Sequence, residues 1–396
     1  MRIALVADTY PPLRTSGAVQ LRDLAGEFRR QDHNVTVMVP APEQREPWIL
    51  TELNGVPVLQ LAAPRTKDIP YVRRTIGELV MPFAMLRNLR KSPLASVRWD
   101  GVVWYSPSIF LGPMAKALKC ASGCGGYLIL RDIFPEWAAD IGKMRRGWPL
   151  YWFFKRIEQY QYAVADTIGV QTPANLAYLK DWARLSGRRL EVLQNWLAYA
   201  PNIGTSLMVT AGPLAGRTIF VYAGNMGVAQ GMDLLLDLAE RLRERRDLGF
   251  LFVGRGSEAS RLQDDAARRR LDHVVFHDEL EPWEIPGLLA QCHIGLITLD
   301  PRHQTHNIPG KFLTYLQAGL PVLAAINRGN DLGELITREE VGRVCVDHSL
   351  DTLQRLALEL ADDRTGWRLI AARCRALFLK QFSPVTAVQQ IVAALI

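Results

Sequence analysis

The chain has 396 residues, 48% of them hydrophobic and 22% charged, so it can fold as two domains of ordinary size with substantial cores. This composition excludes a disordered, collagen-like or coiled-coil protein. No run approaches the roughly 20 apolar residues of a membrane-spanning helix, and the apolar N-terminal run reaches Asp8 too soon for a secretory signal, so we expect a cytoplasmic protein.

The first half of the chain is predicted to alternate strands with helices. A buried strand over 2–7 is followed by a loop with paired prolines, which exclude a helix there, and then by an amphipathic helix over 20–28. This opening predicts a doubly wound parallel sheet. Further strands are predicted at 35–39, 101–105, 127–130 and 167–170.

The second half restarts the same pattern. A strand over 218–222, a glycine-bearing loop over 224–231 and a helix over 232–245 are predicted in succession. Further strands are predicted at 250–253, 274–277, 294–298 and 321–324. We therefore predict an N-terminal domain over 1–198, a C-terminal domain over 199–380 and a final helical segment over 381–396.

The positive charge is concentrated in the first half. The net charge of +7 divides into +9 for residues 1–198 and −2 for residues 199–396. We therefore expect any anionic partner surface to meet the first half.

Three glycine-bearing loops follow predicted strands, at 15–17, 223–227 and 254–257. Ligands of doubly wound sheets bind beyond the carboxyl ends of the strands, where glycine lets backbone N–H groups approach phosphates. None of the loops has the Gly-x-Gly-x-x-Gly pattern or a P-loop lysine, which argues against a dehydrogenase and an NTPase. Each loop alone is also compatible with a simple turn.

The segment 304–323 is the densest in potential function. A polar loop runs into Pro309 and Gly310, and a helix is predicted from Lys311. The helix dipole disfavours a cation in the first turn by a few tenths of a kcal/mol, so Lys311 suits a site that an anion joins. The alternative is a surface lysine.

Four features of the chain resemble the retaining glycosyltransferases of family 4, which have the GT-B fold. They are the opening at 8–12 with Gly17, the hinge-like segment 193–196, the loop 222–231 and the segment 309–322. The resemblance implies two Rossmann-like domains facing across a cleft, with the C-terminal helix crossing back to the first domain.

The resemblance also implies the chemistry. The co-substrate is a nucleotide-diphosphate sugar bound by the second domain, the acceptor is bound by the first, and neither a metal nor another cofactor is needed. The loop at 222–231 is similar to that of a subgroup that builds bacterial surface polysaccharides with N-acetylated amino sugars such as N-acetylfucosamine. This implies a UDP-sugar donor and a lipid-linked or oligosaccharide acceptor in O-antigen or capsule synthesis.

The donor-binding positions depart from the common family pattern. Where many members carry an arginine and a lysine, this chain has Asn225 and Gln230, and where they carry two glutamates it has His306 and Thr314. The diphosphate charge then falls to basic residues, for which charge-assisted hydrogen bonds are suited. The implied donor set is Gly17, Gly224, Asn225, Gln230, Arg255, Gly310, Lys311 and Thr314.

The acceptor positions follow the strand predicted at 127–130. The resemblance implies that Asp132 handles the acceptor hydroxyl, with Arg131, Glu136 and Ser16 as further acceptor contacts. Asp132, His306 and Lys311 are then the candidate catalytic residues of a transfer on one face of the sugar, in which the protein positions groups and stabilises charge. The alternative is that Asp132 caps the next element.

Two segments of the first half, 71–91 and 143–156, mix basic residues with aromatic and aliphatic ones. Such segments bind the interface of anionic bilayers. We therefore expect a peripheral protein on the inner face of the cytoplasmic membrane, where a lipid-linked acceptor would dock. The alternative is that these aromatic side chains belong to the core.

Three other functions remain open on the sequence. A sugar-nucleotide epimerase shares the two-domain fold, and the missing glutamates leave room for a sugar-nucleotide-binding protein without catalysis. A pI near 9.2 also allows a nucleic-acid-binding protein, but no nucleic-acid-binding motif is present, so we expect no nucleic-acid partner.

Overall fold

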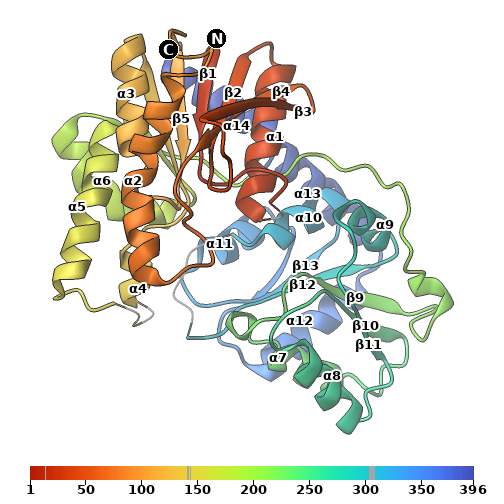
Figure 1. The fold of residues 1–396 in the computed structure, drawn as a ribbon. Helices are drawn as coiled ribbons and strands as arrows, with labels where there is room; N and C mark the ends of the chain where they lie inside the picture. The colour runs from red at the N-terminus through yellow and green to blue at the C-terminus, as the bar shows by residue number, and fades with distance from the viewer. Residues whose placement is uncertain (14, 141, 143, 303–307) are drawn as a thin grey trace. The chain divides into compact units, whose positions relative to one another are not determined.

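The computed structural model describes residues 1–13, 15–140, 142, 144–302 and 308–396 (Figure 1). The chain forms two compact units, one of Met1–Asn195 with Pro384–Ile396 and the other of Trp196–Ser383. Among the described residues, none of the helices is long and apolar enough to cross a bilayer.

The first unit contains an eight-stranded sheet in the order β3-β4-β2-β1-β5-β6-β7-β8. Every neighbouring pair is parallel except the hairpin of β3 and β4. The strands are β1 (Arg2–Val6), β2 (Asn34–Ala41), β3 (Trp48–Leu53), β4 (Val56–Ala62), β5 (Gly101–Tyr105), β6 (Gly125–Leu130), β7 (Thr167–Val170) and β8 (Arg189–Val192).

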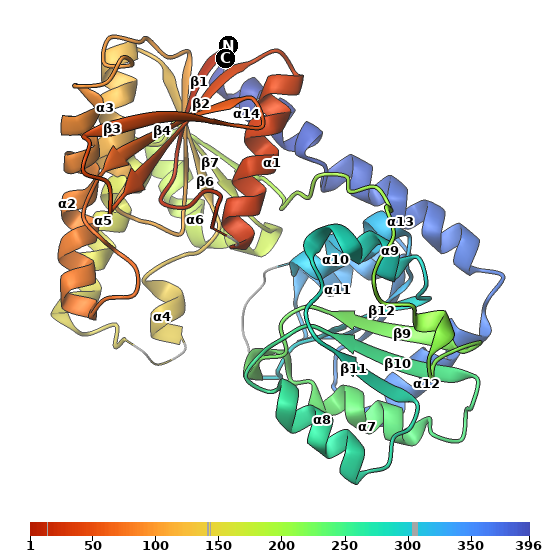
Figure 2. The ribbon, with the colours of Figure 1, turned by 45° about the vertical axis from the view of Figure 1, so that its right-hand side comes forward.

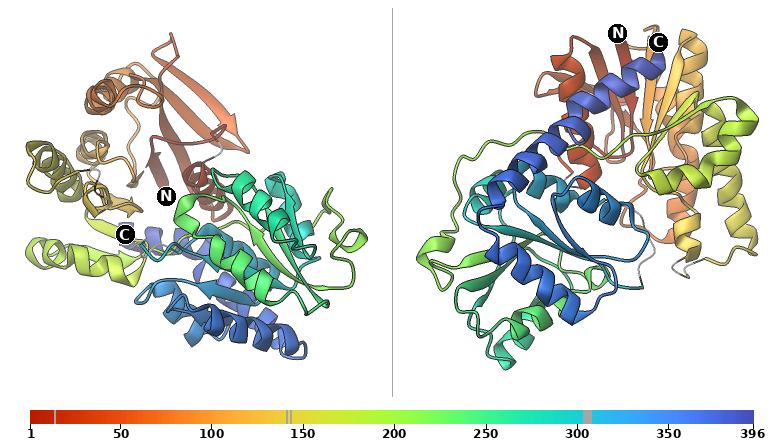
Figure 3. Two further views of the ribbon diagram at one scale, coloured as in Figure 1. Left: turned by 90° about the horizontal axis from the view of Figure 1, so that it is seen from below. Right: turned by 180° about the vertical axis from the view of Figure 1, so that it is seen from behind.

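Helices cover both faces of this sheet (Figures 1 and 3). They are α1 (Ser16–Arg30), α2 (Tyr71–Leu89), α3 (Gly112–Ser122), α4 (Glu136–Asp140), α5 (Pro149–Val164), α6 (Pro173–Ser186) and α14 (Pro384–Leu395). In β1, Ala4 and Val6 join a core with α2, α3 and α5, and the intervening Ile3 and Leu5 are also fully buried. A strand that is apolar on both faces is typical of a parallel sheet between two helix layers.

The C-terminal helix α14 packs against α1 and β6 of the first unit (Figure 2). Gly101 and Gly125 make room for it, since a Cβ on Gly101 would lie 2.7 Å from Cδ1 of Leu395 and a Cβ on Gly125 would lie 3.5 Å from its carbonyl oxygen. The predicted return of the final helix to the first domain is therefore confirmed, and two glycines in neighbouring strands give its physical reason.

The second unit contains a six-stranded parallel sheet in the order β11-β10-β9-β12-β13-β14. Its strands are β9 (Thr218–Ala223), β10 (Leu248–Val253), β11 (Val274–His277), β12 (Ile294–Thr298), β13 (Val322–Ala325) and β14 (Gly342–Cys345). Its helices are η1 (Val209–Ala211), η2 (Val228–Gln230), α7 (Asp233–Arg241), α8 (Ala259–Arg268), η3 (Pro282–Glu284), α9 (Ile285–Leu289), α10 (Gly310–Ala318), α11 (Asp331–Arg338), α12 (Leu350–Asp362) and α13 (Trp367–Gln381).

The predicted fold class, two separate parallel α/β sheets, is confirmed. The strands β3, β4, β8 and β14 were not predicted from the sequence. The β3–β4 hairpin turns at Asn54 and Gly55, which both have positive φ, as the two-residue turns of hairpins require. The strand β3 is largely exposed, so it lacks the buried apolar run by which the other strands were recognised.

Each sheet has a central strand from which the chain builds the sheet in both directions. The strands β2 and β5 lie on opposite sides of β1, and β10 and β12 lie on opposite sides of β9. Ligands of doubly wound sheets bind at the carboxyl ends of the strands at such switch points. Candidate ligand sites are therefore expected at these two sheet edges.

Candidate active site

Two glycine loops of the second unit pack backbone against backbone. A Cβ on Gly254 would lie 2.1 Å from the carbonyl oxygen of Gly224, and a Cβ on Gly256 would lie 2.2 Å from that of Met226. The backbone N–H of Met226 also donates to the carbonyl of Arg255 at 2.8 Å. Glycine is therefore required at both 254 and 256, because any side chain would separate the loops that follow β9 and β10.

Lys311 reaches these loops from the first turn of α10. Its Nζ lies 3.4 Å from the centroid of the Tyr222 ring, and a Cβ on Gly224 would lie 3.8 Å from that Nζ. Burial lowers the pKa of the Lys311 amine from 10.5 to about 7. No carboxylate among the described residues forms an ion pair with it, so the structure holds a basic group without an anion at the carboxyl end of β9.

Tyr315 explains why Lys311 points toward β9. The two side chains are four residues apart and share one face of α10. The Tyr315 hydroxyl accepts the backbone N–H of Ala223 at 3.1 Å and lies 3.2 Å and 3.3 Å from the carbonyls of Val221 and Leu296, to which it can donate. These bonds fix α10 against two neighbouring strands, and Lys311, one turn earlier, is thereby directed at the loop after β9.

Asn225 and Gln230 lie in the loop after β9, as the sequence predicted. The Gln230 Oε1 accepts the backbone N–H of Gly227 at 3.2 Å and the Nδ2 of Asn225 at 3.4 Å. Gln230 therefore shapes the loop from within, while Asn225 is exposed. Their roles as donor contacts remain predictions.

The other predicted donor residues occupy different surroundings. Arg255 is exposed and forms an ion pair with Glu279 at 2.9 Å. Gly310 is the first residue of α10, and the Thr314 hydroxyl donates to its carbonyl at 3.2 Å, within the same helix. His306 lies outside the described residues.

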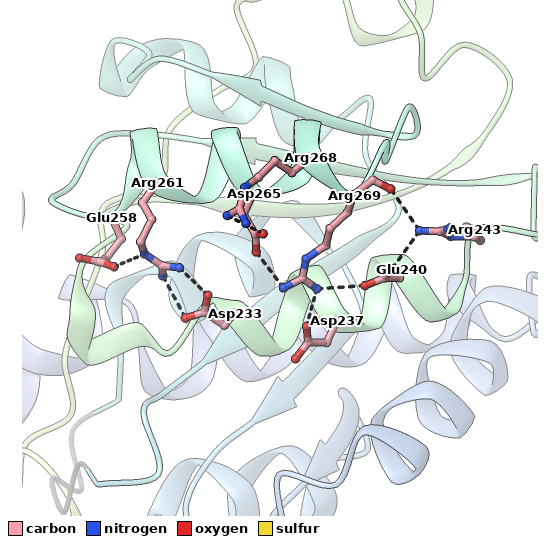
Figure 4. Close-up of polar contacts among 9 residues, drawn as sticks. All are labelled: Asp233, Asp237, Glu240, Arg243, Glu258, Arg261, Asp265, Arg268 and Arg269. Carbon is pink, nitrogen blue, oxygen red and sulfur yellow. Dashed lines mark hydrogen bonds and ion pairs between the residues drawn. The ribbon is translucent and has the colours of Figure 1, made fainter.

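Ion pairs join the two helices that follow the glycine loops, α7 and α8 (Figure 4). Arg261 of α8 forms a two-pronged pair with Asp233 of α7 at 2.8 Å and 2.9 Å. Arg269, just after α8, contacts Asp237 at 2.6 Å and Glu240 at 3.1 Å. These side chains are partly exposed, so each pair contributes modestly to stability. Together the pairs hold side by side the two helices that follow the glycine loops.

In the first unit, Asp132 follows the end of β6, as predicted. It is half-buried, and burial raises the pKa of its carboxyl while the adjacent Arg131 opposes the shift. A carboxylate at a strand end with a raised pKa is a candidate proton acceptor.

Arg131 itself makes contacts with the backbone. Its guanidinium is buried and donates to the carbonyls of Leu193 at 2.6 Å and Gln194 at 3.2 Å. The arginine therefore holds the chain where it leaves β8. Its predicted contact with an acceptor remains untested.

Tyr105, at the end of β5, is a residue that the sequence analysis missed. A Cβ on Gly17 would lie 3.2 Å from the Tyr105 ring and hydroxyl, so the glycine makes this close approach easier. Burial raises the pKa of the Tyr105 phenol to about 12, and the charges of Arg131, Asp132 and Asp8 also act on it. The ring thus lies among the groups at the carboxyl ends of β1, β5 and β6.

Ser16 and Gly17 were expected in a loop, but they form the first turn of α1. The helix begins this early because the Thr15 hydroxyl caps it, accepting the backbone N–H of Ala18 at 3.2 Å. Ser16 is exposed there.

Asp8 was also missed as a site residue. It lies two residues after the end of β1, and burial raises the pKa of its carboxyl against the opposing charge of Lys67. A carboxylate that immediately follows a buried strand is the sequence signal that could have identified it. Asp8 and Asp132 thus present two acids of raised pKa at the same edge of the first sheet.

Glu136 is held by side chains of α5 and α6. Its carboxylate accepts from Tyr151 at 2.6 Å, Lys155 at 3.0 Å and Tyr178 at 3.1 Å. Burial alone would raise its pKa, but these donors outweigh it and lower the pKa of Glu136. Glu136 therefore ties α4 to its neighbours, and acceptor binding by it remains a prediction.

The basic aromatic segments divide between core and surface. In the second segment, Tyr151 and Phe154 are buried, which agrees with the core alternative, whereas Trp152 and Phe153 are exposed. In the first segment α2 exposes Tyr71, Val72, Ile76, Val80 and Phe83.

Residues 217–363 match the family described as glycosyl transferases group 1. This range covers most of the second unit, which is therefore similar to the domains of that family. Gly224, Arg255 and Lys311 all lie within the matched range of this domain.

Curated relatives extend the likeness over both units of the chain. The chain is 21% identical over 365 residues to "Probable glycosyltransferase WbjE" of Pseudomonas aeruginosa, covering 91% of this chain and 90% of the relative. It is 24% identical over 308 residues to "Putative colanic acid biosynthesis glycosyl transferase WcaI" of Escherichia coli (strain K12), covering 71% and 72%. The crystal structure of Anabaena Alr3699/HepE in complex with UDP shares the fold, with a TM-score of 0.68, 16% identity and 99% of each chain covered.

Proposed function

We propose that this chain is a retaining glycosyltransferase that moves a sugar from a nucleotide-diphosphate donor to a saccharide acceptor. The observation that carries the proposal is the Lys311 amine beside Gly224, at the carboxyl end of β9 and within the matched glycosyltransferase domain. A basic group without an anionic partner among the described residues is suited to a diphosphate.

In this proposal the second unit binds the donor. The backbone of the loops at Gly224 and Gly254 approaches the diphosphate, which glycine permits. Lys311 neutralises the charge that develops on the leaving diphosphate, so the reaction needs no metal. Arg255 adds charge if it leaves Glu279, while Asn225, Thr314 and His306 complete the donor contacts.

The first unit binds the acceptor. Asp132 orients the acceptor hydroxyl and takes part in its deprotonation, which its raised pKa favours. Asp8 is placed to share this work, because it lies at the same edge of the sheet and its pKa is also raised by burial. Ser16, in the first turn of α1, adds an acceptor contact, and Gly17 beside it stays a proposed donor contact.

We further infer the substrate class. WbjE is described as a probable glycosyltransferase and WcaI as a putative colanic acid biosynthesis glycosyl transferase, and the HepE structure holds UDP. Together with the loop at 222–231, these support a UDP-linked N-acetylated amino sugar as donor and a lipid-linked or oligosaccharide acceptor in the synthesis of bacterial O-antigen or capsule.

The acceptor class fits a membrane-facing surface on the first unit. The helices α2 and α5 both pack against α3, on one face of the sheet (Figure 1). Their exposed apolar residues stand beside exposed arginines, including Arg73, Arg87 and Arg156. Such a surface binds anionic lipid through both its apolar and its charged groups, which supports peripheral attachment to the inner face of the cytoplasmic membrane.

A thermal melting scan tests the donor site. The purified protein is heated with UDP-, GDP-, ADP- and dTDP-sugars in the presence of EDTA. A ligand at 100 times its dissociation constant that binds only the folded state stabilises it by about 2.7 kcal/mol. We expect a shift with UDP-sugars that persists in EDTA and is lost in Lys311→Met.

The matched control is Lys180→Met, which removes an exposed lysine of α6 in the first unit. This variant should keep the donor shift. A protein that melts at the same temperature with and without every nucleotide sugar would refute the donor site. Donor binding without transfer to any saccharide or lipid-linked acceptor would instead favour the non-catalytic alternative, and conversion of the donor without acceptor would favour the epimerase.

A further inference from the structure

Tyr222 contacts both parts of the proposed donor site, the Lys311 amine and the loop after β9. It is the fifth residue of β9 and is fully buried. Its ring packs edge-on against Phe252 of the neighbouring strand, with centroids 6.4 Å apart and an interplanar angle of 78°. This packing fixes the plane of the ring, so the Lys311 amine on its face has a defined position.

The two ends of the Tyr222 side chain contact different elements. The ring face holds the Lys311 Nζ at 3.4 Å from its centroid, a cation–π arrangement at close range. The hydroxyl donates to the carbonyl of Asn225 at 2.6 Å. One side chain therefore fixes both the basic group and the loop that begins at Gly224.

We propose that Tyr222 is a positioning residue of the donor site, which holds the Lys311 ammonium and the loop after β9 in the arrangement that binds a diphosphate. The inference rests on the proposed function. An ammonium has three N–H donors, so Lys311 can keep its contact with the ring while it donates to phosphate oxygens.

The groups around Lys311 bear on whether its amine is protonated. Among the described residues, the phenol of Tyr222 lies against the Lys311 amine and that of Tyr315 lies one turn further along α10, and burial raises the pKa of both. On the loop after β10, Arg255 pairs with Glu279. The pKa of Lys311 itself is lowered to about 7 by burial. The amine is therefore largely neutral at about pH 8 in the free protein and becomes protonated beside a diphosphate.

Donor binding should therefore take up close to one proton at about pH 8 and little at about pH 6. The dissociation constant of a UDP-sugar should rise about tenfold between these two pH values, because one more protonation step is linked to binding at the higher pH. The probe is the UDP-sugar that gives the largest melting shift, because its diphosphate does not titrate in this range.

The experiment is titration calorimetry in buffers of different ionisation enthalpy, which counts the protons taken up. It uses wild type, Lys311→Met, Tyr222→Leu, Tyr222→Phe and the double variant Tyr222→Leu/Lys311→Met. Lys311→Met should raise the dissociation constant about ten- to a hundredfold and abolish proton uptake. Tyr222→Phe keeps the ring, so it should keep the proton uptake while it weakens binding through the loop.

The double-mutant cycle separates positioning from a general structural effect. Tyr222→Leu should weaken donor binding about two- to tenfold beyond Tyr222→Phe in the wild-type background. When Lys311 is already replaced, its effect should fall to that of the lost hydroxyl, which Tyr222→Phe measures. Equal effects in both backgrounds, or wild-type binding without proton uptake, would overturn the inference. If no UDP-sugar binds the wild type at all, it is the proposed function that fails.

Discussion

The hydroxyl of Tyr315 accepts the backbone N–H of Ala223 at 3.1 Å, which attaches α10 to the last residue of β9. The phenol is completely buried and also contacts the carbonyls of Val221 and Leu296. A Cβ on Gly295 would lie 2.5 Å from the Tyr315 ring, so the strand makes room for it. The position of Lys311, one helical turn earlier, depends on this attachment.

Replacing Tyr315 with phenylalanine should therefore lower both stability and donor affinity. The change leaves the Ala223 N–H without its buried partner, which costs about 1–3 kcal/mol. Urea unfolding checks the stability and the donor melting shift checks the site. Tyr199→Phe, at a residue that is 73% exposed, is the matched control and should leave both unchanged. A Tyr315→Phe protein as stable as the control would contradict this account of α10.

Lys311→Met should be more stable than wild type when no donor is present. Because the folded-state pKa of Lys311 is lowered from 10.5 to about 7, the unfolded chain binds more protons between these values. Wild-type stability then rises with pH across this window and is lowest below pH 7. The variant should melt a few degrees higher than wild type at about pH 6, and the difference should shrink by about pH 10. Melting curves at both pH values check this, with Lys180→Met as the control.

Asp132→Asn should remove activity without loss of stability. A positioned proton acceptor contributes about 100- to 10,000-fold to the rate, so kcat with a competent acceptor should fall by that order while donor binding persists. The folded-state pKa of Asp132 is raised from 3.8, so this carboxyl costs stability as the pH rises through that raised value. At neutral pH the asparagine variant should melt at or above the wild-type temperature.

Arg131, next to Asp132 in the chain, should affect stability where Asp132 affects activity. Arg131→Met would leave the carbonyls of Leu193 and Gln194 without their donor, and it should lower the free energy of unfolding by about 2–4 kcal/mol. Chemical denaturation of the two variants side by side measures this. If Asp132→Asn were the destabilised variant and Arg131→Met the stable but inactive one, the two roles would have to be exchanged.

Gly101→Val should weaken the docking of α14. A Cβ at Gly101 would lie 2.7 Å from Cδ1 of Leu395, so a valine forces the helix outward at a cost of about 1–3 kcal/mol. Adding Leu395→Ala makes space again and should recover part of the loss. Urea unfolding of the single and double variants tests the contact. A double variant whose losses simply add would show that these residues do not meet.

Membrane binding should depend on the exposed aromatic residues of α5. Trp152→Ser/Phe153→Ser should reduce flotation with vesicles of phosphatidylglycerol, because both side chains are exposed beside cationic residues. Leu369→Ser, at an exposed apolar residue of α13, is the control. High salt should weaken the wild-type binding by screening the charges. Vesicle binding that is unchanged in the double serine variant would remove α5 from the proposed membrane surface.

The sequence by itself determined the local features of this protein. Buried apolar runs such as Ile3 to Val6 predict parallel strands because only a sheet covered on both faces buries every residue of a run. The position of Lys311 in a first helical turn and of Asp132 after a strand could also be predicted, because each depends on a few adjacent residues. The glycine at 254 could be noticed, but the loop that it must approach could not.

Only the tertiary structure decided which distant groups meet. Tyr222 lies under Lys311, and Arg131 is bound to the carbonyls after β8, because strand order and helix packing bring these segments together. The same holds for α5, where Phe154 is core and the adjacent Phe153 is exposed. Hydrophobicity is alike for the two residues, and only the helix layer on the first sheet determines which of them is covered.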